Sequence, residues 1–178
     1  MKNSIRMMIL IVLVCAMSAC SEKKLTFEDM KKAEATLFKQ DGTLDSANFP
    51  KVADKYIKFV EQNPDDTTAS LWLYHAMELN VMMKNSEKAV ALCDNLMNNY
   101  PDSKWTPRGM YILGSMVYED QYKDLDKARE ILEKILSDYP GSEIEESVKA
   151  SIKYLGWSPD EIMNDININQ FKMGQVFE

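Results

Sequence analysis

The sequence has few of the residues on which catalytic and metal sites depend. It contains one histidine, His75, together with three cysteines and six glycines. No second imidazole or thiol is spaced to complete a zinc site with His75, and no cluster of glycines could surround a phosphate group. Carboxylates are plentiful, but they fall at predicted loops and helix starts, where they suit the helix dipole. We therefore expect no catalytic residue, no metal and no cofactor, and we interpret His75 as a structural residue.

A hydrophobic run long enough to span a bilayer is also absent from the sequence. The apolar stretch at residues 7–16 is shorter than the roughly 20 residues that a spanning helix requires. It follows Lys2 and Arg6 and precedes small residues, which is the pattern of a cleaved secretory leader. We therefore assign residues 1–19 to a signal peptide.

The end of this leader contains a cysteine in a recognisable setting. Residues 17–20 read Met-Ser-Ala-Cys and resemble the lipobox of bacterial lipoproteins, although Leu is commoner than Met at its first position. The resemblance implies that Cys20 receives a diacylglycerol and that the new amino terminus is acylated, which gives a stable lipid anchor. The next residue, Ser21, resembles that of lipoproteins sent to the outer membrane, with the protein facing the periplasm. An ordinary signal peptide with an incidental cysteine is the alternative.

Cysteine is too scarce for a disulfide in the mature chain. Cys15 lies in the signal peptide and Cys20 would be lipidated, so Cys93 would be the remaining thiol. It occupies an apolar position in a predicted helix, which indicates burial rather than catalysis. Removing residues 1–19 takes away two basic residues and changes the net charge from −7 to −9. This acidity argues against nucleic-acid binding and against electrostatic adhesion to anionic lipid.

Three predicted helices are each terminated by a proline, namely Pro64, Pro101 and Pro140. We call the interval from Pro101 to Pro140 the long offset, and the slightly smaller interval from Pro64 to Pro101 the short offset. Apolar residues between the prolines recur at the spacing of amphipathic helices, so each unit is predicted to be a pair of helices. A gap-free slide by the long offset superposes similar residues of the later units: Trp72 on Tyr111, Met77 on Met116, Ala89 on Ala128 and Leu96 on Ile135.

These units resemble the tetratricopeptide repeat family, whose signature is a large residue, Leu-Gly, an aromatic, Ala-x₃-Phe and a final Pro. In the second unit His75 replaces the glycine, and in the third a two-residue insertion separates the helices. The resemblance covers residues 26–157 and implies an all-α, right-handed solenoid of antiparallel helix pairs with about three and a half repeats. The third unit matches the signature at Met110, Leu113, Gly114, Val117, Ala128, Leu132 and Pro140.

The two ends of the repeat region are predicted separately. Residues 20–25 form a lipidated cysteine and polar tether, and residues 158–166 form a C-terminal capping helix that starts with a capping box at Ser158 and Glu161. Solenoids need covered ends, which favours a cap over a binding site. Residues 167–178 are predicted to be a tail that docks as a strand or stays mobile.

The family resemblance implies a groove lined by the first helix of each unit. Trp72 and Tyr111 share a register and would point along one face, where rigid aromatic side chains suit an extended peptide or a helix. The alternative is that both rings pack between neighbouring units. The candidate partner-binding residues are Trp72 and Ala76 in the second unit, and Arg108, Tyr111, Ser115, Tyr118 and Glu119 in the third.

The resemblance to a repeat lipoprotein implies a non-enzymatic scaffold or adaptor that binds another envelope protein or peptide. The chain is similar to the envelope tetratricopeptide proteins that act in outer-membrane protein assembly and beside the Tol-Pal system. An accessory lipoprotein that binds a glycan or another small ligand is the alternative. An enzyme is the class that the residues support least.

Overall fold

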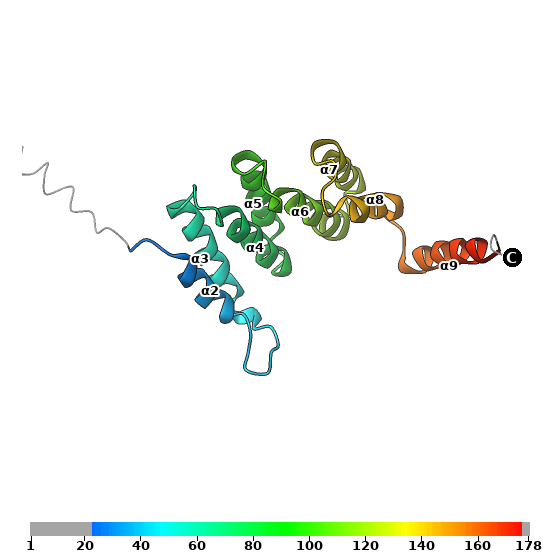
Figure 1. Cartoon of the computed structure of the whole chain (residues 1–178). Coiled ribbons are helices and arrows are strands. Elements are labelled where there is room, and N and C mark those ends of the chain that lie inside the picture. The colour runs from blue at the N-terminus through cyan, green and yellow to red at the C-terminus, as the bar shows by residue number, and fades with distance from the viewer. Residues whose placement is uncertain (1–22, 176–178) are drawn as a thin grey trace, which may run out of the picture.

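The computed structural model describes residues 23–175, which form a succession of helices (Figure 1). The predicted signal peptide and Cys20 lie outside the described residues. Within the described range the only β-type pairing is an isolated bridge between Phe38 and Leu44. The elements are α2 (Phe27–Ala35), η1 (Ser46–Asn48), α3 (Phe49–Gln62), α4 (Ala69–Met82), α5 (Ser86–Asn99), α6 (Trp105–Ile112), η2 (Leu113–Tyr122), α7 (Leu125–Asp138), α8 (Glu145–Tyr154) and α9 (Pro159–Gln175).

The helices form pairs that stack in chain order, from α2 and α3 at one end to α8 at the other (Figure 1). Helix α4 pairs with α5, and the continuous α6–η2 helix pairs with α7. This arrangement confirms the predicted all-α solenoid of helix pairs. Between residues 23 and 175, no helix is long and apolar enough to cross a membrane.

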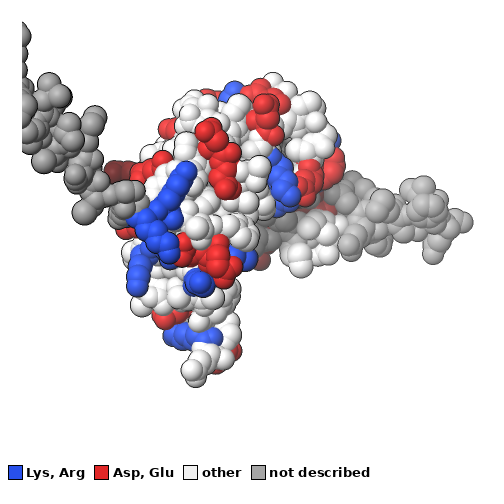
Figure 2. Space-filling view, turned by 60° about the vertical axis from the view of Figure 1, so that its left-hand side comes forward, with Lys and Arg blue, Asp and Glu red and all other residues white. Residues whose placement is uncertain are grey.

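One continuous core runs between the helix pairs, and charged side chains lie outside it (Figure 2). Helix α3 shows the usual amphipathic pattern, because its buried residues recur three and four positions apart. Helix α4 is buried on most of its surface, since α3, α5 and α6 all pack against it. The buried residues of α3 are Phe49, Val52, Ala53, Tyr56, Phe59 and Val60.

The second helices of the later repeats keep the predicted long offset. Helices α5 and α7 each contain 14 residues, and the long offset carries the first and last residues of α5 onto those of α7. It also carries Lys84 onto Lys123, which lie in the turns before these helices and both have a φ of 58°. The predicted offset is therefore confirmed for the second helices and the turns that lead into them.

The first helices follow a different register. Trp72 packs against Tyr56, whereas a Cβ placed on Gly109 would lie 3.8 Å from Cys93 Sγ. The short offset carries Tyr56 onto Cys93, and it also carries Trp72 onto Gly109. Gly109, and not Tyr111, is therefore the counterpart of Trp72. The gap-free slide by the long offset is wrong within the first helices.

Element η2 accounts for the change of register. Its ten residues form a π-helical stretch, in which each N–H reaches back five residues instead of four. This wider turn accommodates the two-residue insertion inside the first helix of the third repeat. The sequence analysis predicted the insertion between the two helices instead. The later helix α7 thus returns to the long offset.

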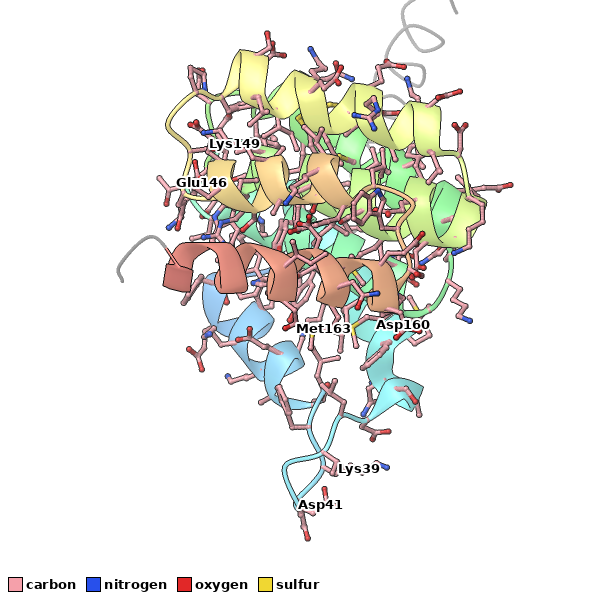
Figure 3. All side chains as sticks on the ribbon, turned by 90° about the vertical axis from the view of Figure 1, so that its right-hand side faces the viewer. Lys39, Asp41, Glu146, Lys149, Asp160 and Met163 are labelled. Atoms are coloured by element: carbon pink, nitrogen blue, oxygen red, sulfur yellow. The ribbon has the colours of Figure 1, made fainter. Side chains whose placement is uncertain are left out.

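The C-terminal helix begins as predicted but extends further. The backbone N–H of Ser158 donates to Glu161 Oε2 at 2.7 Å, which confirms the predicted helix start. Helix α9 then continues to Gln175, so the prediction of a separate tail after residue 166 is wrong over residues 167–175. The helix extends beyond α8 (Figure 1), and Met163, on its side away from α8 (Figure 3), is 59% exposed. Helix α9 therefore covers the last repeat only in part.

The start of the described chain is fixed to the end of α3. The N–H of Leu25 donates to Gln62 Oε1 at 2.8 Å, and Asn63 Nδ2 donates to the carbonyl oxygen of Leu25 at 3.2 Å. A capping box between Thr26 and Asp29 then starts α2. The predicted polar tether thus ends before Leu25.

Candidate partner-binding face

Partly exposed residues follow one side of α4 and of the α6–η2 helix. They recur three and four positions apart, at positions that the short offset relates to one another. Because the neighbouring helices bury the remaining sides, this stripe is the surface that the first helices present to solvent. We call it the first-helix face and define it by His75, Glu78, Arg108, Ser115 and Glu119.

His75 lies at the centre of an aromatic cluster on this face. Its ring centroid is 5.5 Å from that of Tyr74, 5.8 Å from Trp72 and 6.0 Å from Trp105. Its Nδ1 atom lies 2.7 Å from Glu78 Oε2, and the two side chains are 30% and 35% exposed. The cluster therefore presents an imidazole and a carboxylate to solvent above buried rings.

Trp105 links this cluster to the cationic part of the face. Its ring lies 5.1 Å from Tyr74 on one side, and the guanidinium carbon of Arg108 lies 5.5 Å from its centroid. Such a contact between a cation and an aromatic ring is attractive. Arg108 also forms an ion pair of 2.7 Å with Glu143, but its buried Nε atom has no hydrogen-bond partner in the described part of the chain. Arg108 is thus held in place with one donor unused.

Two of the predicted groove residues are not on the surface. Trp72 is 1% exposed and Ala76 is fully buried, so neither can contact a partner, and their prediction as groove residues is wrong. Trp72 fills the space between α3 and α4, where its Nε1 atom donates to Thr68 Oγ1 at 3.1 Å. The error arises from the change of register. The counterpart of Trp72 is the buried Gly109, so Trp72 and Tyr111 do not lie on the same face of their helices.

The two remaining aromatic predictions, Tyr111 and Tyr118, lie in different places relative to the face. Tyr111 is half-buried, and its hydroxyl lies 3.1 Å from Ser151 Oγ of α8. Tyr118 is turned toward the second helices, because its ring packs edge-on against Tyr122 and its closest charges include Lys127 of α7. Burial raises the pKa of Tyr118. Tyr111 therefore borders the first-helix face, whereas Tyr118 lies outside it.

Ser115 and Glu119 lie on the face as predicted by their spacing. Ser115 Oγ donates to the carbonyl oxygen of Tyr111 at 2.7 Å. Glu119 Oε1 accepts the N–H of Gly156 at 3.1 Å, which joins η2 to the end of α8. Beside Glu119 is a cavity of about 410 Å³, which is lined by Tyr111, Glu119, Ser147, Ala150, Ser151, Tyr154, Trp157 and Ile162.

Sequence reasoning did not identify the pairing of His75 with Glu78 or the role of Trp105. The spacing of His75 and Glu78, three residues apart on one helix, was the available signal. The prediction of a buried Cys93 is confirmed, since the side chain is fully buried and burial raises its pKa to about 12. Among the described residues, no group of three or more His, Cys, Asp or Glu side chains is placed to hold a metal ion.

Comparison with known proteins identifies the repeat type. Two stretches, residues 73–103 and 109–142, match the tetratricopeptide repeat family. They include most of α4 with α5, and most of α6 with η2 and α7. Neither the curated proteins nor the solved structures contain a match to the chain.

Proposed function

We propose, from the two tetratricopeptide repeats that this chain contains, that it is a non-enzymatic scaffold whose first-helix face binds a segment of another envelope protein. The observation that carries this proposal is the composition of that face. Donors and acceptors from His75, Glu78 and Arg108 stand partly exposed on a firm layer of aromatic rings. Groups held in this way lose little freedom when a partner binds.

The chemistry of the face favours an extended, basic segment as the ligand. The Arg108 side chain is 33% exposed beside the ring of Trp105, so its guanidinium group can donate to a main-chain carbonyl of the segment. Glu78 and Glu119 can accept hydrogen bonds from lysine or arginine side chains. The net charge of −7 for the whole chain would also attract a basic partner.

We further propose that an acylated Cys20 anchors the scaffold to the outer membrane, with the repeats in the periplasm. The support is the sequence pattern of residues 1–20, namely a basic start, a short apolar run and a lipobox-like ending. Only a few residues separate Cys20 from the clamped Leu25 in the sequence, so an anchor at Cys20 would keep the first repeat near the membrane.

Affinity capture from detergent-solubilised membranes tests the scaffold proposal. The wild-type chain is compared with Arg108→Ala and with Arg129→Ala, which removes an exposed arginine from α7 that pairs with Glu133 at 3.8 Å. We expect a co-purifying protein that Arg108→Ala loses and Arg129→Ala retains. Equal capture by both variants, or no captured protein with any of them, would contradict binding at the first-helix face.

A glycan-binding accessory lipoprotein is the second candidate, and the cavity beside Glu119 favours it. Trp157 is 44% exposed and packs edge-on against Tyr154 at 5.6 Å, so aromatic and polar groups both line this cavity. Thermal unfolding in the presence of envelope oligosaccharides tests this candidate. Stabilisation that Trp157→Ala abolishes would support it, and the absence of any sugar-dependent stabilisation would exclude it.

A further inference from the structure

Charge is unevenly distributed along this acidic chain. Residues 23–62 contain eight lysines and seven acidic residues, a balance of +1, whereas residues 63–178 contain 11 basic and 20 acidic residues, a balance of −9. The first repeat therefore has a slightly positive balance, whereas the rest of the chain is acidic. Figure 2 turns this end of the molecule toward the viewer and shows basic side chains gathered there. The net charge of the whole chain does not reveal this local excess of basic residues.

A cavity of about 350 Å³ lies between α2 and α3 in the first repeat. Lys32 borders it from α2, and Lys51 and Lys55 border it from α3. No carboxylate is among its lining residues, which are completed by Ala33, Thr36, Asn48 and Val52. We call this cavity the lysine pocket. Three lysines from two helices therefore border one volume.

The acidic residues near the lysine pocket are engaged elsewhere. Glu34 pairs with Lys31 at 2.6 Å, and Asp54 pairs with Lys88 of α5 at 2.9 Å. Asp29 accepts hydrogen bonds from Thr26 in the capping box of α2. These three carboxylates are held by other groups and do not line the pocket.

The lysines of the pocket are only weakly compensated. Lys51 has no ion pair or hydrogen bond with any described residue, and Lys55 lies in the electrostatic field of Asp29 without a hydrogen bond to it. Lys32 reaches Glu28 only at 4.0 Å, with both side chains about 70% exposed. An exposed pair of this kind is screened by water and contributes little. The pocket thus keeps a positive potential.

The backbone around the lysine pocket is already fixed. Asn48 Nδ2 donates to the carbonyl oxygen of Thr36 at 2.9 Å and to Asp45 Oδ2 at 3.1 Å. These bonds join the end of α2 to the start of α3 across the intervening loop. A ligand would therefore have to order only the lysine side chains.

We propose that the lysine pocket binds a phosphate group. Three ammonium groups suit phosphate better than a single carboxylate, because phosphate carries about −1.5 to −2 charges at neutral pH and three acceptor oxygens. Lysine acts as a point charge toward phosphate and needs no fixed planar geometry. The group can come from free phosphate or from the headgroup of an anionic lipid. The proposal depends on residues 32–55 and is independent of acylation at Cys20.

The test uses the full chain with Cys20→Ser, so that no acyl chain contributes to binding. Calorimetric titration with inorganic phosphate forms one arm. Co-sedimentation with phosphatidylcholine vesicles, with and without phosphatidylglycerol, forms the other. In each arm this chain is compared with Lys51→Gln/Lys55→Gln and with the control Lys84→Gln/Lys123→Gln, which removes the same charge from later repeats. Circular dichroism checks that each variant is folded.

We expect the Lys51→Gln/Lys55→Gln variant to lose about tenfold or more in affinity for at least one probe, and the control to stay within about threefold. A loss for inorganic phosphate identifies free phosphate as a source, and a loss for the vesicles alone identifies the lipid headgroup. Restoring the charges as Lys51→Arg/Lys55→Arg should restore most of the affinity. Equal losses in both glutamine variants, or no binding of either probe, would overturn the proposal.

Discussion

Trp72 and Gly109 occupy the same place in successive repeats, although one carries an indole and the other no side chain. Trp72 lies with its ring centroid 5.0 Å from that of Tyr56. A Cβ on Gly109 would lie 2.9 Å from Leu96 Cδ1 and 3.8 Å from Cys93 Sγ. The smaller residue at 109 thus lets α6 approach α5 closely, while the indole fills a wider space between α3 and α4. The two interfaces are therefore not interchangeable.

The first prediction concerns Trp72 as a core residue. Trp72→Ala should lower the free energy of unfolding by about 3–5 kcal/mol, because it removes a fully buried ring and leaves a cavity. Urea unfolding followed by circular dichroism measures the change. Trp157→Ala is the control, and since that ring is 44% exposed its effect should stay below about 1 kcal/mol. Similar effects for the two variants would contradict the burial of Trp72.

A second prediction separates contact from backbone strain at two glycines. Gly141 and Gly156 have φ values of 76° and 78°, so alanine is strained at both. A Cβ on Gly156 would also lie 2.8 Å from Leu125 Cδ1, whereas one on Gly141 would meet nothing within 4 Å. Gly156→Ala should therefore cost about 1 kcal/mol more than Gly141→Ala in thermal unfolding. Equal costs would show that Leu125 moves aside freely.

A third prediction concerns the reactivity of Cys93. The buried thiol should not react with an aromatic disulfide reagent at about pH 8, because reaction requires an exposed thiolate. Labelling should follow the rate of unfolding as urea is added, and should be immediate in the unfolded chain. Fast labelling of the folded protein with retention of its circular dichroism spectrum would contradict this. The full chain with Cys20→Ser leaves Cys15 as the only other cysteine. Cys15→Ser removes that background.

A fourth prediction concerns stability at alkaline pH. Burial raises the pKa of Cys93 from 9.0 to about 12, so the neutral thiol stabilises the fold fully below pH 9. This contribution is lost as the pH rises from 9 toward 12, because the unfolded chain ionises more readily. Burial raises the pKa values of Tyr56 and Tyr74 in the same direction. The unfolding temperature of the wild type should fall between about pH 8 and 11, and the unfolding temperature of Cys93→Ala should fall less steeply over the same range.

A fifth prediction concerns the proposed anchor. Cys20→Ser should move the protein from the membrane fraction to the soluble fraction, since it removes the thiol that would receive the diacylglycerol. Mass spectrometry of the wild type should show the added mass of acyl chains on the mature chain. A variant that stays in the membrane fraction and still carries acyl mass would contradict lipidation at Cys20. Ser21→Ala serves as the neighbouring control.

The fold could be predicted from the sequence because its determinants are local. Proline after each second helix and the apolar spacing of Ala128, Leu132 and similar residues are visible without a structure. The register of the first helices was not visible, because the inserted residues lie inside η2, where the apolar spacing looks helical in either register. The length of α9 was missed because residues 167–170, Asn-Ile-Asn-Gln, have weak helix propensity.

The first-helix face could be predicted only in part. Arg108, Ser115 and Glu119 are partly exposed on the first helices, where their polar side chains mark the solvent side, and their contact with a partner stays a prediction. His75 was assigned to a structural role alone, because the rings around it come from α3 and α6 as well as from α4. Such a cluster depends on how closely neighbouring repeats pack, and the spacing between repeats cannot be read directly from a single sequence.

The clamp at Leu25 has a mechanical consequence. Because Leu25 bonds to Gln62 and Asn63, a pull on the chain ahead of it is transmitted first to the end of α3. The capping box at Thr26 and Asp29 lies behind this point and carries less of the load. Tension would thus have to break bonds to the end of α3 before α2 could be pulled away. The start of the first repeat is thus tied to the end of its second helix as well as to its first.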